Sequence, residues 1–158
     1  DDLPEILGKI LDADGIVLAS PNYINNVNAR MKALLDRMAD MIHCQRLLGK
    51  FCAAVSTAGG SGSGEVAAYL NQSMFLMGAD VAGAASVNLS DGEEAFEGAV
   101  KESYALGQNL ADLVRRGIPC HEQAAGHAEM LDRMKALISM HAGDWEYQYD
   151  YFTAKKWV

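Results

Sequence analysis

Two short segments of this 158-residue chain carry the residue types best suited to binding a small ligand. The first is Thr57-Ala58-Gly59-Gly60-Ser61-Gly62-Ser63-Gly64. Glycine lets backbone N–H groups approach a ligand closely, and a helix N-terminus favours partial negative charge. A glycine-rich turn that opens a helix can therefore hold acceptor atoms. The alternative is a flexible loop without a function.

The spacing of these glycines argues against two common nucleotide-binding loops. No Gly-Lys-Ser/Thr sequence follows them, as a P-loop would require, and this disfavours nucleoside triphosphate chemistry. Gly60-x-Gly62 is followed by glycine at position 64, one residue too early for the dinucleotide fingerprint. The composition suits a loop that cradles the carbonyl oxygens of a ring system instead.

The second segment is Ser20-Pro21-Asn22-Tyr23-Ile24-Asn25-Asn26-Val27-Asn28. Pro21 restricts the backbone where a strand is expected to end, and Tyr23 offers an aromatic face and a hydroxyl group. Asn25, Asn26 and Asn28 offer amides for hydrogen bonds, and one of them is expected to cap the following helix. Turn and capping chemistry alone is the alternative explanation for the asparagines.

The segments that position these loops alternate between helical and strand patterns. Apolar residues recur at helical spacing over 3–11, and residues 15–20 form a short apolar run typical of a strand buried on both faces. The pattern continues with a helix over 27–38, a strand over 50–57, a helix over 65–77, a strand over 80–89 and a helix over 91–116. This order predicts an α/β fold with parallel strands. Ligands of such sheets bind outside the carboxyl ends of the strands, where both polar segments lie.

Composition narrows the possible partners. The formal net charge of −8 argues against a nucleic acid or an anionic membrane surface as a partner. No apolar run is long enough to span a bilayer, which needs about 18 residues or more. Cys44, Cys52 and Cys120 form no CxxC pair and no metal-ligand spacing with histidine, so we expect reduced thiols in a cytoplasmic protein and no bound metal.

One motif is more specific than these patterns. Residues Ala13-Asp14-Gly15-Ile16-Val17-Leu18-Ala19-Ser20-Pro21-Asn22-Tyr23, followed by Lys32-Ala33-Leu34-Leu35-Asp36-Arg37, resemble a signature of the NADPH-dependent FMN reductases. Within that family the pattern is similar to the iron–sulfur flavoprotein and multimeric flavodoxin branch. Gly49-Lys50 and the later Thr57-x-Gly59-Gly60 also match, and the resemblance extends from Leu3 to about Arg116.

The resemblance implies a flavodoxin-like three-layer α/β/α fold with strand order 2-1-3-4-5 and FMN at the switch point. It also implies that the first strand and its phosphate loop are missing, because the chain starts with an amphipathic helix. We expect residues 1–118 to form the FMN-binding domain and residues 119–158 a helical and aromatic extension. The expected cofactor contacts are Ser20, Pro21, Asn22, Tyr23, Asn25, Asn26, Thr57, Ala58, Gly59, Gly60, Gly62 and Gly64.

The implied activity is electron transfer from NAD(P)H through FMN to a small acceptor such as a quinone or a flavin. We expect no catalytic acid or base, because the cofactor supplies the chemistry. Family members form homodimers or homotetramers, which is the expectation here. No iron–sulfur cysteine motif is present in the sequence, so no cluster is expected on this chain. Two alternatives are a flavodoxin-like electron carrier without its own substrate and a flavin-free interaction domain.

The segment after about Glu122 differs from the rest of the chain. Met130, Met134, Leu137 and Ile138 predict another helix, and residues 144–152 alternate aromatic with polar side chains. This aromatic segment either covers a partner subunit or the flavin site, or docks on its own domain.

Overall fold

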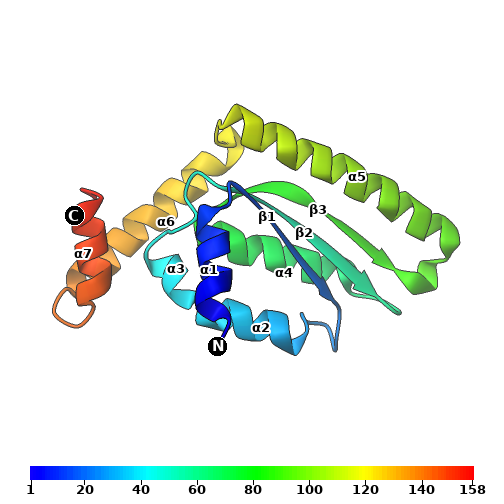
Figure 1. The fold of residues 1–158 in the computed structure, drawn as a ribbon, viewed down its shortest axis with the longest axis horizontal. Coiled ribbons are helices and arrows are strands. Elements are labelled where there is room, and N and C mark those ends of the chain that lie inside the picture. The colour runs from blue at the N-terminus through cyan, green and yellow to red at the C-terminus, as the bar shows by residue number, and fades with distance from the viewer.

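The computed structural model describes residues 1–158 and contains a three-stranded parallel sheet with helices on both faces (Figure 1). The strands lie in the order β1-β2-β3 and comprise β1 (Gly15–Pro21), β2 (Phe51–Ala58) and β3 (Asp80–Asn88). Gly15 pairs with Phe51 and Pro21 with Thr57, so β1 and β2 end together. Ala58 pairs with Asn88, so the carboxyl end of β3 lies beside the carboxyl ends of β1 and β2. The predicted α/β fold with parallel strands is confirmed.

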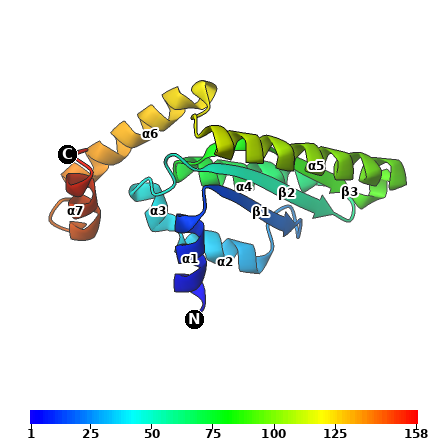
Figure 2. The same cartoon turned by 45° about the horizontal axis from the view of Figure 1, so that its top comes forward.

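The helices form the outer two layers. They are α1 (Leu3–Asp12), α2 (Ala29–Arg37), α3 (Ala39–His43), α4 (Ser63–Leu76), the short 3₁₀ helix η1 (Leu89–Asp91), α5 (Glu93–Arg116), α6 (His121–Met140) and α7 (Glu146–Ala154). Figure 2 shows α5 along one face of the sheet and α1 and α2 on the opposite face. Helix α4 belongs to the layer of α1 and α2, because its buried side chains pack in the same cluster as theirs, whereas Leu110 of α5 packs in a separate cluster. This arrangement confirms the three-layer α/β/α architecture that the resemblance implied.

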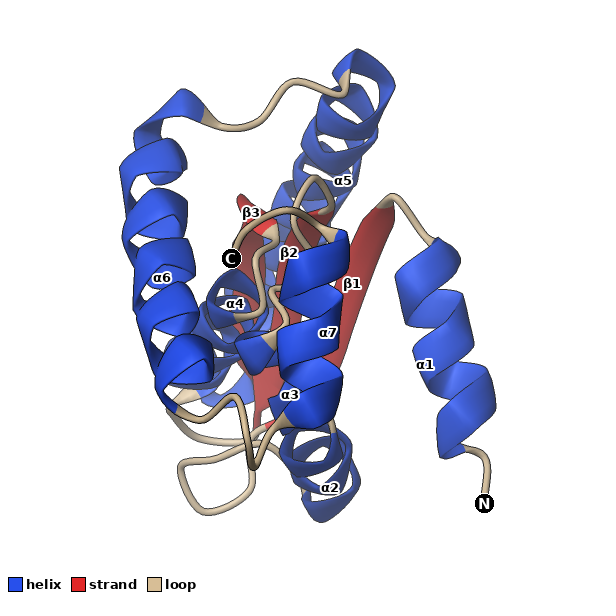
Figure 3. Ribbon diagram, turned by 90° about the vertical axis from the view of Figure 1, so that its left-hand side faces the viewer, coloured by secondary structure: helices blue, strands red, loops and turns tan.

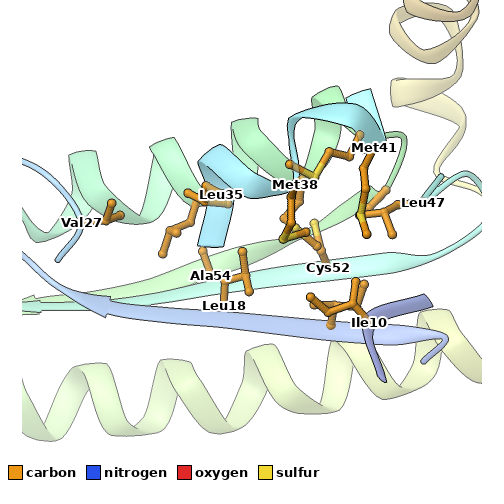
Figure 4. Packing of buried hydrophobic residues seen from close by; sticks show 14 of the residues in the cluster. Ile10, Leu18, Val27, Leu35, Met38, Met41, Leu47, Cys52 and Ala54 are labelled. Carbon is orange, nitrogen blue, oxygen red and sulfur yellow. The ribbon is translucent and has the colours of Figure 1, made fainter. Parts of the chain in front are cut away.

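The main hydrophobic core lies between the sheet and α1–α4. It contains 16 buried residues, and in Figure 4 the labelled strand residues Leu18, Cys52 and Ala54 point toward these helices and away from α5. In β1, Ile16, Leu18 and Ser20 are buried on this side, whereas the alternate residues Val17 and Ala19 are exposed. The period of two follows from the pleat of a strand with only one covered face. β2 is buried on both faces over most of its length, as expected for the central strand.

The two edge strands, β3 and β1, differ in the side-chain contacts that their backbones make. Side-chain amides cap the backbone of β3: Asn71 Nδ2 donates to Gly83 O, and Asn109 Nδ2 donates to Ala82 O, each at 3.0 Å. Gln123 both donates to Val81 O and accepts from Val81 N, each at 2.9 Å. Such contacts block pairing with a further strand. No side-chain amide binds the backbone of β1, whose Val17 is 55% exposed. The amide contacts therefore close the first half of the β3 edge, whereas the edge of β1 has none.

The first turns of α6 are anchored at the amino end of β3. Asp80 is 2% exposed, and its Oδ1 lies 3.1 Å from His127 Nε2. Its other oxygen accepts a hydrogen bond from the backbone N–H of Cys120 at 3.2 Å. The His127 ring stacks on Phe75 with centroids 4.4 Å apart. A buried carboxylate with two partners thus ties α6 to the sheet and to α4.

The aromatic segment forms α7 and the residue before it, and it docks on its own domain (Figure 3). Phe152 packs with Met134 and Ile138 of α6 in a separate small core. Trp145 stacks on His43 of α3 at 4.8 Å, and Gln148 Nε2 donates to Asp40 Oδ1 at 2.6 Å. Of the two alternatives for this segment, the structure therefore supports docking on the same chain.

Two of the three cysteines, Cys44 and Cys52, are part of the buried core. Cys44 and Cys52 are fully buried, and burial raises the pKa of each thiol to about 12. Both therefore remain protonated near neutral pH and are poor nucleophiles. No group of three or more His, Cys, Asp or Glu side chains is arranged to hold a metal ion. None of the helices has the length and apolar character required to cross a membrane.

Candidate functional site

Three loops meet at the edge of the sheet where the strands end. They are residues 22–28 after β1, residues 59–62 after β2 and residues 89–92 after β3, and we call them together the carboxyl-edge site. Asn22 of the first loop donates from its backbone N–H to Thr57 O at 2.7 Å and from Nδ2 to Ser61 O at 2.6 Å. Ser90 of the third loop donates to Gly59 O at 3.0 Å and to Gly60 O at 2.6 Å. The glycine loop is therefore held from both sides.

Gly62 shapes the turn from β2 into α4. Its φ of +85° lies in the left-handed region, which side chains of L-residues rarely adopt. A Cβ atom added there would overlap Asn22 Nδ2 and lie 3.3 Å from Asn25 Oδ1. Only glycine fits both the backbone conformation and the packing against the first loop.

The helix after this turn begins earlier than the sequence predicted. Helix α4 starts at Ser63 and not near Glu65, because Asn88 Oδ1 accepts a hydrogen bond from the N–H of Ser63 at 3.2 Å. Gly64, expected in the loop, therefore lies in the first turn of α4, where a Cβ atom added to it would lie 3.8 Å from Ser86 Oγ of β3. This placement puts Gly64 beside the sheet and outside the turn.

The glycine loop presents a row of unused donors. The backbone N–H groups of Gly59, Gly60, Ser61 and Gly62 make no hydrogen bond within the protein. A Cβ added at Gly59 or Gly60 would meet nothing within 4 Å, so there is room above the loop. Asn22 Oδ1 is buried and also lacks a donor. These features fit a ligand that carries several hydrogen-bond acceptors and at least one N–H group, as the flavin ring does.

The loop after β1 forms a tight turn at its tip. Tyr23 and Asn26 exchange backbone hydrogen bonds of 2.9 and 3.2 Å, and the two residues between them have positive φ angles of 53° at Ile24 and 56° at Asn25. This conformation is costly for a β-branched residue such as Ile24, whose side chain is fully exposed. Tyr23 is 64% exposed beside it. Backbone strain of the kind seen at Ile24 clusters at functional sites in proteins, so this turn is a candidate for a ligand contact.

The remaining residues predicted from the sequence have supporting positions. Asn28 caps α2, since its Oδ1 accepts from Met31 N at 2.9 Å, which confirms that one asparagine of the loop is a cap. Ser20 is buried and accepts the N–H of Asn28 at 2.9 Å, so it fixes the far end of the loop. Pro21, Thr57 and Ala58 are the last residues of their strands. Asn26 accepts from the N–H of Val27.

Sequence reasoning missed the third loop. Ser90 and Asn88 hold the glycine loop and the start of α4, yet neither residue was among the predicted site residues. The same argument that located the first two loops could have found them, because β3 also ends at this edge. None of the three loops contains a lysine or an arginine. The carboxyl-edge site on this chain therefore suits an uncharged ring better than a phosphate group.

Comparison with known proteins places these features in a family context. The family model described as NADPH-dependent FMN reductase matches residues 1–94. The iron-sulfur flavoprotein of Archaeoglobus fulgidus is 30% identical over 152 residues, which cover 93% of this chain and 69% of that protein. An iron-sulfur flavoprotein of Methanocaldococcus jannaschii is 38% identical over 65 residues, which cover 41% of this chain and 34% of that protein.

Solved structures show the same fold at low sequence identity. RosB, solved with the bound intermediate 8-demethyl-8-formylriboflavin-5'-phosphate, has a TM-score of 0.60 at 18% identity, covering 82% of this chain and 60% of that chain. A flavodoxin, WrbA-like protein from Agrobacterium tumefaciens has a TM-score of 0.58 at 14% identity, with coverages of 72% and 74%. The apo form of the NADH:FMN oxidoreductase EMOB has a TM-score of 0.53 at 21% identity, with coverages of 73% and 59%. These similarities establish a flavodoxin-like fold.

Proposed function

This chain belongs to the NADPH-dependent FMN reductase family, and from that premise we propose that it is an FMN-dependent oxidoreductase. We propose further that it takes electrons from NADPH or NADH and delivers them to a small acceptor such as a quinone or a flavin. The observation that carries the proposal is the row of four free backbone N–H groups at residues 59–62. They lie in an open loop at the carboxyl edge of a parallel sheet, where ligands of this architecture bind.

The residues of the carboxyl-edge site have distinct roles in this proposal. The N–H groups of residues 59–62, which have no partner in the protein, would bind acceptor atoms of the FMN ring, and the unpartnered Asn22 Oδ1 would accept a hydrogen bond from a ring N–H. Tyr23 is exposed beside the glycine loop and would offer its aromatic face to the solvent side of the ring. Asn25 and Asn26 keep this rim in its turn conformation. Because these loops contain no lysine or arginine, they would contact the ring and not the phosphate group of FMN.

FMN, when bound, supplies the redox chemistry by accepting a hydride from the nicotinamide and passing two electrons to the acceptor. The protein contributes binding, orientation and electrostatics. Backbone donors stabilise negative charge on the atoms that they contact, and they do so without reorganisation. This leaves no step that needs an acid or a base from the side chains of the carboxyl-edge site.

The test is NADPH or NADH oxidation by the purified protein, supplemented with FMN and a quinone acceptor. We expect many turnovers per protein molecule, above the rate of free FMN at the same concentration. A protein that binds FMN but does not oxidise either nicotinamide would be an electron carrier, a function that the net charge of −8 also suits. A protein that binds no flavin would keep only the fold of the family.

A further inference from the structure

The third loop contributes a residue that controls the direction of the donors in the glycine loop. Ser90 uses both of its hydrogen-bond donors on consecutive carbonyl groups. Its N–H binds Gly59 O at 3.0 Å, and its Oγ binds Gly60 O at 2.6 Å. Asn22 Nδ2 binds the next carbonyl, Ser61 O, at 2.6 Å. Three successive peptide groups are thus fixed through their oxygen atoms.

Because the peptide unit is planar, these contacts also determine the direction in which the N–H groups point. The structure contains no cis peptide bonds, so in every peptide the N–H points opposite to the C=O. The peptide that carries Gly59 O also carries the N–H of Gly60, and the peptide that carries Gly60 O carries the N–H of Ser61. Because Ser90 holds both oxygens on its own side, both N–H groups point away from η1. Neither N–H has a partner in the protein.

We propose that Ser90 is a positioning residue, which aims the N–H groups of Gly60 and Ser61 at acceptor atoms of the FMN ring. This inference rests on the proposed function. Glycine at 59 and 60 leaves these peptide groups otherwise free to rotate, since no side chain constrains them. Two fixed neighbouring N–H groups form a concave site with partial positive charge. Such a site binds an acceptor atom more tightly when reduction of the flavin makes that atom more negative. Ser90 therefore favours reduced FMN over oxidised FMN.

The variant Ser90→Ala removes the Oγ contact with Gly60 O and keeps the backbone contact with Gly59 O. We expect it to weaken the binding of reduced FMN about tenfold more than that of oxidised FMN. For a two-electron couple, that factor corresponds to a midpoint potential about 30 mV more negative. Ser90→Thr retains a hydroxyl group and should restore the wild-type potential. In the protein without FMN, Ser90→Ala should also broaden or shift the amide resonances of Gly60 and Ser61.

Ser73→Ala is the matched control. Ser73 Oγ also donates to a backbone carbonyl, Tyr69 O at 2.8 Å, but it does so on the exposed face of α4. An equal loss of affinity for both redox forms, or the same potential in Ser90→Ala and Ser73→Ala, would overturn the positioning role while FMN binding by the wild-type protein stands. Failure of the wild-type protein to bind FMN would overturn both this inference and the proposed function.

Discussion

Replacing Gly62 with alanine is expected to lower the free energy of unfolding by about 1–3 kcal/mol, because the new side chain is forced into the left-handed region. The Cβ atom would also overlap Asn22 Nδ2, which would break the contact between Asn22 and Ser61 O. The first loop and the glycine loop would then separate. We therefore expect FMN affinity to fall at least tenfold, about 1.4 kcal/mol. Urea unfolding and a flavin fluorescence titration measure the two effects.

Gly60→Ala is the control for this prediction. Gly60 has no positive φ, and a Cβ added there meets nothing within 4 Å. Its free energy of unfolding should stay within about 0.5 kcal/mol of the wild-type value. If Gly62→Ala were as stable as Gly60→Ala and bound FMN as well as the wild-type protein does, the glycine loop would not be held in the way described.

The largest effect on stability is expected at Asp80, far from the carboxyl-edge site. Asp80→Ala removes a buried carboxylate that binds His127 Nε2 and the N–H of Cys120. It leaves the buried ring of His127, whose Nδ1 is already without a partner, and the N–H of the partly buried Cys120 without their acceptor. Breaking a buried pair in this way costs about 3–5 kcal/mol. Chemical denaturation followed by far-UV circular dichroism measures the loss.

Asp132→Ala provides the comparison at an exposed pair. Asp132 lies 3.6 Å from Lys135 on the surface of the same helix, α6, where an ion pair contributes about 0–1 kcal/mol. The main difference between the two variants is that the carboxylate removed is buried at Asp80 and exposed at Asp132. A loss below about 1 kcal/mol in Asp80→Ala would mean that the buried cluster does not anchor α6 to the sheet.

The elements that form the sheet and its covering helices could be predicted from local patterns. The strand expected over 80–89 is observed as Asp80–Asn88, and the helix expected to end at Arg116 ends there, with Gly117 at a φ of +60°. Runs of apolar residues and glycine stop signals are local properties, and tertiary packing reinforces them here. The positions of the first two loops followed from the parallel topology alone.

The contacts that complete the site depend on pairs of residues distant in sequence. Asn22 and Ser61 are 39 positions apart, and Ser90 and Gly60 are 30 apart. No periodicity or spacing encodes such pairs, so Ser90 could not be singled out without the structure. The same holds for Asp80 and His127, which are 47 positions apart. The aromatic residues of α7 likewise gave no indication of which surface they contact.

The visible absorption spectrum of the purified protein with FMN, recorded before and after anaerobic addition of NADPH, tests the central claim most directly. The account predicts a spectrum of bound flavin that bleaches when NADPH is added. A protein that shows no bound flavin even with excess FMN would contradict the assignment of the carboxyl-edge site to this cofactor.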